Sequence, residues 1–201
     1  MVLVGCGWAG VEGSGTAKSE VRPVASFHAI DISGAIKTEI AIAADQRVEI
    51  SGDDNLIPLV TTEVDGKGLE IGTRKNVRPK LPLVARVSAP RIDAIEVSGS
   101  SNVAIHGVHD DSLTLELTGS ATVHGDGTVR QLTIEVSGSG NVELAQLAAE
   151  RASVTVTGSG NIEIAASQAL DVHITGSGAI TYHGDPAVTQ DITGSGRLVK
   201  R

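Results

Sequence analysis

Apolar residues alternate with polar ones around a glycine that recurs through the second half of the chain. In nearly every copy, Val, Ile or Leu lies two and four residues before this glycine and four residues after it. Thr114, Glu116 and Thr118 are typical of the polar residues between the apolar positions. A period of two residues indicates a β-strand with one apolar face. The pattern therefore predicts two short strands in each copy, joined at the glycine.

The glycine stands in a short phrase of small residues, such as "VSGSGN" from Val136 and "VTGSGN" from Val156. The copies are 18–20 residues apart, at Gly99, Gly119, Gly138, Gly158, Gly176 and Gly194. A repeat this short cannot bury its apolar face alone, but stacked copies bury their faces together. The sequence thus predicts an all-β fold: a right-handed parallel β-helix with rungs of roughly 18–20 residues and a structural corner at each of these glycines.

A glycine-rich phrase can also cradle a phosphate group. That use needs a strand before the loop and a helix N-terminus after it. Here a second strand follows each phrase, and no Lys-Ser or Lys-Thr pair follows any of them. The corner interpretation is therefore preferred, with Asn102, Thr122, Asn141 and Asn161 expected to stack beside it.

The first half of the chain has alternating segments without the strict phrase, as in Ile30/Ile32 and Val48/Ile50. These strands are expected to extend the stack and cap its first end. The basic, Pro-containing segment 74–82 is expected to be an exposed loop. Residues 144–152 have helical propensity, and we expect them to be a connection between strands, with room for one helical turn.

Composition narrows the possible partners. The 201 residues carry a formal charge of −8 and no basic stripe, which argues against nucleic acid. No apolar run reaches the roughly 18 residues of a membrane-spanning helix. The aromatic residues are Trp8, Phe27 and Tyr182, so the core must be aliphatic and aromatic platforms for sugars are scarce. A single cysteine excludes an internal disulfide.

Several segments together resemble one known family. They are "FHAIDISG" from Phe27, "VEISGDDNL" from Val48, "GLEI" from Gly68, the serial "SGSG" phrases and the closing "YHGDPAVTQDITGSGRL". In this order they resemble the head GIN domain family over Ala25 to Arg201. The copy at residues 117–123, "LTGSATV", departs from the repeat. The resemblance implies a β-helical fold, a bacterial cell-envelope setting, an adhesion or binding role, and no catalytic residues.

The N-terminus carries "LVGC", which has the form of a bacterial lipobox ending at Cys6. In that motif the cysteine becomes the lipid-bearing N-terminus after cleavage, and two acyl signals suffice for stable anchoring. The basic region and apolar core of a full signal do not precede it in this sequence. We expect residues 1–5 to be a signal remnant, 6–24 a flexible Gly/Ser-rich tether, and 25–201 a single β-helical domain. A free thiol in the tail of a cytoplasmic protein is the alternative.

Clustered carboxylates on a β-helix can indicate a polysaccharide lyase or hydrolase. Glu96, Glu116 and Glu135 share one repeat offset and are expected to form an outward file, without Arg or Lys. Their repulsion favours side chains splayed into water, with calcium bridging as the alternative. His106 and His109 could hold a metal but are expected to be solvated. A hydroxyl file from Ser98 to Thr193 makes ice binding conceivable, although the glutamates interrupt its neighbouring file.

These observations predict a non-enzymatic cell-envelope protein with no cofactor, no metal site and no catalytic residues. It would present polar ladders to a protein or glycan partner of the envelope. It would contact the membrane only through a lipid on Cys6, facing the periplasm or lying at the outer membrane. A polysaccharide-acting β-helix enzyme is the alternative.

Overall fold

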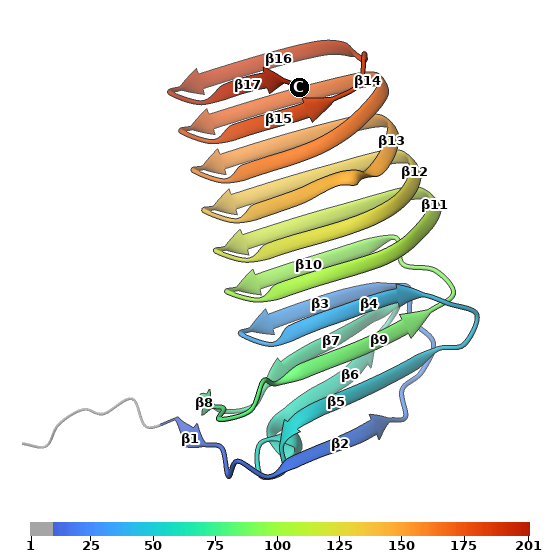
Figure 1. Cartoon of the computed structure of the whole chain (residues 1–201), viewed down its shortest axis with the longest axis vertical. Coiled ribbons are helices and arrows are strands. Elements are labelled where there is room, and N and C mark those ends of the chain that lie inside the picture. The colour runs from blue at the N-terminus through green and yellow to red at the C-terminus, as the bar shows by residue number, and fades with distance from the viewer. Residues whose placement is uncertain (1–9) are drawn as a thin grey trace, which may run out of the picture.

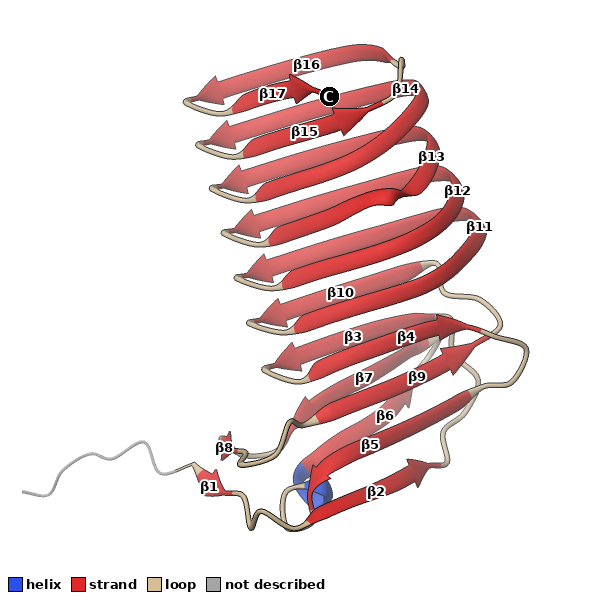
Figure 2. Ribbon diagram, viewed as in Figure 1, coloured by secondary structure: helices blue, strands red, loops and turns tan. Residues whose placement is uncertain are grey.

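A computed structural model describes residues 10–201 as an all-β solenoid, drawn in Figure 1. Within that range the helical element is one short turn, Ile57–Leu59 (Figure 2). None of the described helical structure is long and apolar enough to cross a membrane. The strands are β1 (Val11–Glu12), β2 (Ala17–Arg22), β3 (Ala29–Gly34), β4 (Lys37–Ile42), β5 (Arg47–Asp53), β6 (Val60–Asp65), β7 (Gly68–Thr73), β8 (Val77–Arg78), β9 (Val84–Ala89), β10 (Ala94–Gly99), β11 (Asn102–Gly119), β12 (Thr122–Gly138), β13 (Asn141–Gly158), β14 (Asn161–Gly176), β15 (Ala179–His183), β16 (Ala187–Gly194) and β17 (Arg197–Lys200).

The predicted parallel stack is confirmed. Each of β11 to β14 runs along one face of the solenoid, curves round, and returns along the other face to the next glycine corner (Figure 1). Neighbouring coils pair in parallel, and their corner glycines lie in register. The aligned glycines are Gly34, Gly99, Gly119, Gly138, Gly158, Gly176 and Gly194.

The corner geometry explains why glycine recurs. Gly138 has φ 122°, a conformation that residues with a side chain rarely adopt. A Cβ placed on it would lie 2.6 Å from the carbonyl oxygen of Gly119 in the coil below. That same oxygen accepts a 2.8 Å hydrogen bond from the backbone N–H of Ser139. Both the turn and the close stacking of coils therefore require a missing side chain.

The core is an aliphatic column between the two faces. Ile134, Val136 and Val142 are each at most 2% exposed, as the alternation around Gly138 predicts. Equivalent residues of the neighbouring coils are buried in the same way, so each coil closes the core of the next. Phe27 is the aromatic member of this column, beside the first coil.

The first end of the solenoid is capped by antiparallel strands, as expected from the irregular first half. β2 pairs with β5 and β5 with β9, while β6 pairs with β7 on the other face. These pairings extend the two faces beyond β4 and β3 (Figure 1).

The expected tether is wrong for the part that the structure describes. From Gly10 onward the chain is held in the fold: β1 pairs with β8, and β2 lies along β5. β2 is largely exposed, so its sequence "AKSEVR" lacks the apolar alternation that marks a strand. The proposed signal remnant 1–5 and Cys6 lie outside the described residues.

The segment 144–152 is also corrected. It is part of the continuous strand β13, with Leu144, Leu147, Ala149 and Ala152 buried. The pairing register shifts between Leu144 and Ala148 and again after Ala149. These bulges break the period of two and made the segment resemble a helix.

The basic segment 74–82 is mostly exposed, as expected, but it includes β8. Val77 of β8 is partly buried against the core and lies opposite Val11. The segment therefore has a defined position beside the start of the described chain.

Candidate functional site

A large groove lies where the coils curve from one face to the other. It has a volume of about 780 Å³ and extends from β11 to the residue after β15. The coil between Gly138 and Gly158 is 20 residues long, whereas the next coil, to Gly176, is 18. The extra residues are accommodated by the register shifts in β13, next to the groove. Unequal coil length thus shapes this surface.

Small residues line the middle of the groove. Ala148 on β13 and Ala165 on β14 lie opposite each other, and Thr128 of β12 extends this row. Ala148 is exposed, while the neighbouring Ala149 and Ala166 are buried. Without bulky side chains here, a ligand could lie close to the backbone of several coils.

Charged and polar side chains surround this row and contact one another across the coils. Arg130 lies 3.2 Å from Asp111 of the coil before it. His109 Nδ1 is 2.8 Å from the Thr128 hydroxyl. Glu150 accepts a 3.3 Å hydrogen bond from the Gln168 amide. Donors and acceptors therefore line the groove, and an exposed pair such as Arg130–Asp111 can exchange its partner for a polar ligand at little cost.

Asp110 is a groove residue whose pKa is perturbed. Burial raises its pKa, and neighbouring Asp93 and Asp111 add to the shift, while Arg91 opposes it. Its Oδ2 is buried and has no hydrogen-bond partner, and its Oδ1 lies 3.7 Å from Arg91 Nε. A large cleft with several polar groups and a carboxyl of perturbed pKa is the usual profile of a binding site.

The glutamate file lies on the flat face that contains β10 and β3. Glu96, Glu116 and Glu135 are exposed and in register on adjacent strands. The structure extends the file, because Asp31 pairs with Glu96, and Glu70 pairs with Asp31. Asp31 raises the pKa of Glu96, and burial and Glu116 add to this effect.

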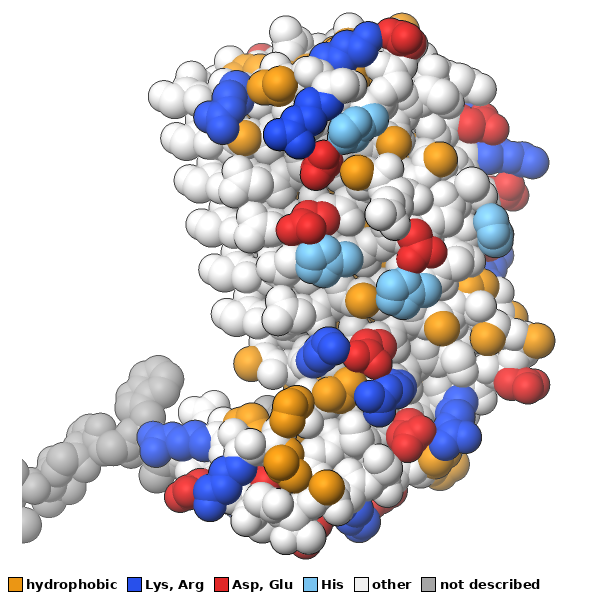
Figure 3. Space-filling view, viewed as in Figure 1, with side chains coloured by type: hydrophobic (Ala, Val, Ile, Leu, Met, Phe, Trp, Pro, Cys, Tyr) orange, Lys and Arg blue, Asp and Glu red, His pale blue; other side chains and the backbone are white. Residues whose placement is uncertain are grey.

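Histidines form a further pattern on the opposite face. His106 Nδ1 is 2.6 Å from Asp126, and His183 Nε2 is 2.8 Å from Glu163; in both pairs the carboxylate lies in an adjacent coil. His124 lies 3.1 Å from Glu143 in the same manner. Figure 3 shows several histidine side chains, in pale blue, near red carboxylates on the face toward the viewer. The described residues contain no group of three or more ligands arranged to hold a metal ion.

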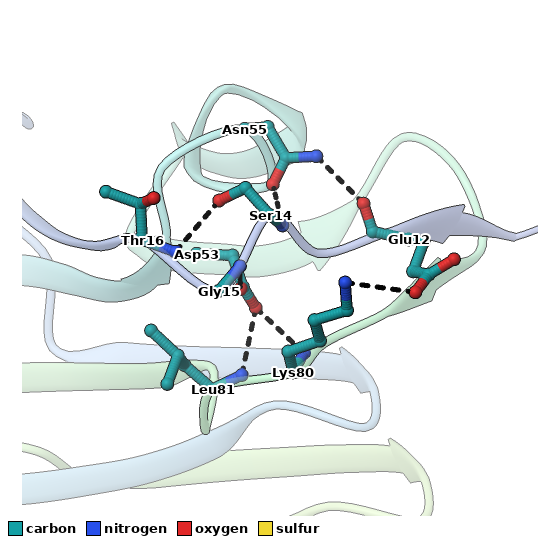
Figure 4. A network of polar contacts seen from close by, with 8 residues as sticks. All are labelled: Glu12, Ser14, Gly15, Thr16, Asp53, Asn55, Lys80 and Leu81. Carbon is teal, nitrogen blue, oxygen red and sulfur yellow. Dashed lines mark hydrogen bonds and ion pairs between the residues drawn. The ribbon is translucent and has the colours of Figure 1, made fainter.

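A polar network holds the N-terminal segment to the cap (Figure 4). Asp53 is fully buried and accepts backbone hydrogen bonds from Gly15, Lys80 and Leu81 at 2.6–3.1 Å. Burial alone would raise its pKa, but these three N–H groups outweigh that effect and lower it. Asn55 adds bonds to Ser14 N–H and to the Glu12 carbonyl. The "SGDDN" motif therefore has a structural role, since Asp53 and Asn55 fix the N-terminal segment to the cap.

Of the residues singled out by the sequence, the glycines lie together at one edge and the glutamates together on one face. His106 and His109 are not brought together at a common partner, because they contact Asp126 and Thr128 respectively. In the asparagine file, Asn161 donates a 3.2 Å side-chain hydrogen bond to Asn141. Apart from His109, the groove residues were missed, although the change in repeat length from 20 to 18 was a signal for them.

Comparison with known proteins agrees with this architecture. Residues 26–186 match the family model described as "Putative auto-transporter adhesin, head GIN domain". Among curated proteins, none matches the chain.

Solved structures show the same fold. A putative adhesin from Bacteroides fragilis superposes with a TM-score of 0.77 at 22% identity, over 96% of this chain and 100% of that one. A putative lipid binding protein from Parabacteroides distasonis gives a TM-score of 0.59 at 22% identity, over the same shares. A putative adhesin from Parabacteroides merdae gives 0.56 at 19% identity, over 95% of this chain and 98% of that one.

Proposed function

Because the chain belongs to the head GIN domain family, whose model bears the name of an adhesin, we propose that it is a non-enzymatic binding module of the bacterial cell envelope. In this proposal the solenoid is a rigid support, and the groove at the curve of β11 to β14 receives the partner. The protein is attached to the membrane through a lipid on Cys6.

The observation that carries the proposal is the groove itself. Its volume of about 780 Å³ falls within the range of roughly 300–1,000 Å³ common to ligand clefts. It crosses the coils from β11 to β14, three steps of about 4.8 Å each, so an extended ligand could lie along the solenoid axis. An extended protein segment or a glycan chain fits this shape.

The chemistry of the groove favours binding over catalysis. Two of its carboxylates contact neighbouring side chains, Asp111 with Arg130 and Glu150 with Gln168. Asp110 has a raised pKa, but one of its oxygens is buried and cannot reach a substrate without rearrangement. Glycosidases need two carboxyl groups that both face the scissile bond.

Blocking the groove tests its role. Ala148 is exposed on β13, so Ala148→Arg places a large side chain in the groove without disturbing the core. Ala145→Arg makes the same change at another exposed position of β13 and is the matched control. Purified protein would be tested on immobilised peptidoglycan, capsular polysaccharide, fibronectin and collagen.

We expect at least one of these probes to bind the parent and the Ala145→Arg variant alike. Ala148→Arg should bind that probe at least about tenfold more weakly. Equal binding by both variants would contradict the assignment of the groove. Release of soluble sugar from a polysaccharide probe would contradict the non-enzymatic role.

The lipid anchor is tested separately in cells. With a full signal sequence supplied, Cys6→Ser should move the protein from the membrane fraction to the soluble fraction, because the thiol that carries the lipid is gone. Persistence of the variant in the membrane fraction would refute lipidation at Cys6.

A further inference from the structure

One short loop concentrates positive charge in an acidic protein. Arg74, Lys75, Arg78 and Lys80 fall within seven residues, all exposed, while the whole chain carries −8. Two exposed carboxylates face them: Glu12 lies 3.1 Å from Lys80, and Glu63 lies 3.6 Å from Arg74. Exposed ion pairs of this kind contribute at most about 1 kcal/mol, so their cations can exchange to another anion.

The loop is fixed beside the start of the described chain. β1 and β8 pair in parallel, and they lie side by side at the base of the solenoid in Figure 1. Val11 N–H donates a 2.8 Å hydrogen bond to the Asn76 carbonyl, and Gly13 N–H donates a 2.9 Å bond to the Arg78 carbonyl. Asp53 fixes the end of the loop through the N–H groups of Lys80 and Leu81.

Covalent geometry limits how far this loop can be from Cys6. Four residue steps separate Cys6 from Gly10, which span at most about 14 Å when fully extended. A lipid on Cys6 would therefore bring the cap, with Arg74 and Lys75, close to the bilayer. The negative surface potential of a membrane acts over a Debye length of about 8–10 Å, which is comparable to this reach.

We propose that the loop of residues 74–80 is a membrane-contact surface whose cations bind anionic lipid headgroups beside the anchor. Its biological setting rests on the proposed lipid attachment at Cys6. The contact orients the solenoid with its capped end toward the bilayer and the β16–β17 coil away from it. The loop supplies a second, electrostatic signal that adds to a lipid chain.

The test uses the single cysteine. Coupling the Cys6 thiol to a maleimide-bearing lipid in vesicles sets the anchor chemically, so the result does not depend on whether cells acylate Cys6. Lysines are then acetylated with a water-soluble reagent, and the rate at each one is followed by mass spectrometry. Besides the maleimide lipid, the vesicles contain either phosphatidylcholine or equal parts of phosphatidylcholine and phosphatidylglycerol.

On the anionic vesicles we expect acetylation of Lys75 and Lys80 to slow at least about threefold, and 0.5 M salt should restore it. Lys200 is the matched control, since its side chain is 51% exposed against 53% for Lys80, and it lies on β17, at the opposite end of the solenoid. Its rate should be the same on both vesicles.

Three results would overturn the proposal. The first is an equal rate for Lys75 and Lys80 on the two kinds of vesicle. The second is equal slowing of Lys200, which would indicate a different orientation. The third is undiminished protection of Lys80 in an Arg74→Gln/Lys75→Gln variant whose thermal melt matches the parent. None of these results bears on the groove, whose variants are tested without vesicles.

Discussion

Replacing a corner glycine should destabilise the solenoid through two separable effects. Gly138→Ala places a Cβ on a residue with φ 122°, which costs about 1–3 kcal/mol in backbone strain. The same Cβ would lie 2.6 Å from the Gly119 carbonyl oxygen, so the coils must move apart locally. That movement weakens the Ser139 N–H bond to Gly119, worth about 1 kcal/mol. The expected loss is about 2–4 kcal/mol.

Two other glycines separate the effects. Gly34 has φ 92°, but no atom lies within 4 Å of the place that a Cβ would take, so Gly34→Ala reports strain without a clash. Gly68 is free of positive φ, and its nearest contact would be 3.7 Å away, so Gly68→Ala has neither effect. Its stability should change by less than about 1 kcal/mol, in either direction.

Urea unfolding followed by circular dichroism measures the three variants against the parent. The expected order of stability is Gly68→Ala, then Gly34→Ala, then Gly138→Ala as the least stable. Native-state hydrogen exchange should show that the losses in Gly138→Ala are greatest in the coils on either side of the corner. If Gly138→Ala unfolds at the same urea concentration as Gly68→Ala, the corner is neither strained nor close-packed, and the reasoning fails.

Three further predictions concern charge. The pKa of Glu96 is raised in the fold, so ionisation of this carboxyl destabilises the protein above that pKa. Glu96→Gln should therefore raise the free energy of unfolding by about 0.5 kcal/mol at pH 7. The difference from the parent should vanish below about pH 4, where the carboxyl is protonated, and thermal melts recorded across this pH range measure it. Calorimetric titration should find no calcium binding tighter than about 100 µM, and tight binding that Glu116→Gln abolishes would show that the glutamate file holds calcium. Replacing Arg197, Lys200 and Arg201 with Ser should increase light scattering on storage. These cations lie on or next to β17, at the edge of the described sheet, and their charge opposes pairing of that edge with another molecule. Unchanged scattering would count against this role.

Most of the solenoid could be predicted because the apolar side chains of every repeat point into the same core. Ile134, Val136 and Val142 are apolar for a single reason, the closure of a coil, and the glycine between them fixes the corner. The same alternation, less regular, correctly predicted that the strands of the first half extend and cap the stack.

Features held by backbone contacts were not predictable in this way. β2 is polar and exposed, and its place in the sheet depends on pairing with β5. Asp53 stands in a motif that looks like a polar turn, but it is buried and collects N–H groups from segments 38 and 28 residues away. Nothing in the local sequence shows those distances.

The groove illustrates a third kind of difficulty. Its shape depends on a mismatch between neighbouring coils, and Leu144 and Leu147 are both buried although they are three residues apart. Periodicity identifies what coils share, whereas this surface arises from where they differ. The extension of the glutamate file to Asp31 and Glu70 was missed for a related reason, since β3 and β7 lack the repeated phrase.

The aligned corner glycines also mean that the height of the solenoid changes in fixed steps of one coil. Each corner is bonded to the one below it through backbone hydrogen bonds that repeat from coil to coil, such as Ser120 N–H to the Gly99 carbonyl and Thr122 N–H to the Ser101 carbonyl, both at 2.9 Å. A whole coil could therefore be inserted or deleted between two corners without altering the chemistry of any other corner. Every such event would change the height of the molecule by about 4.8 Å. Duplication or loss of one coil between β3 and β11 would move the groove relative to the capped end in steps of that size, so the reach of the protein can evolve separately from what it binds.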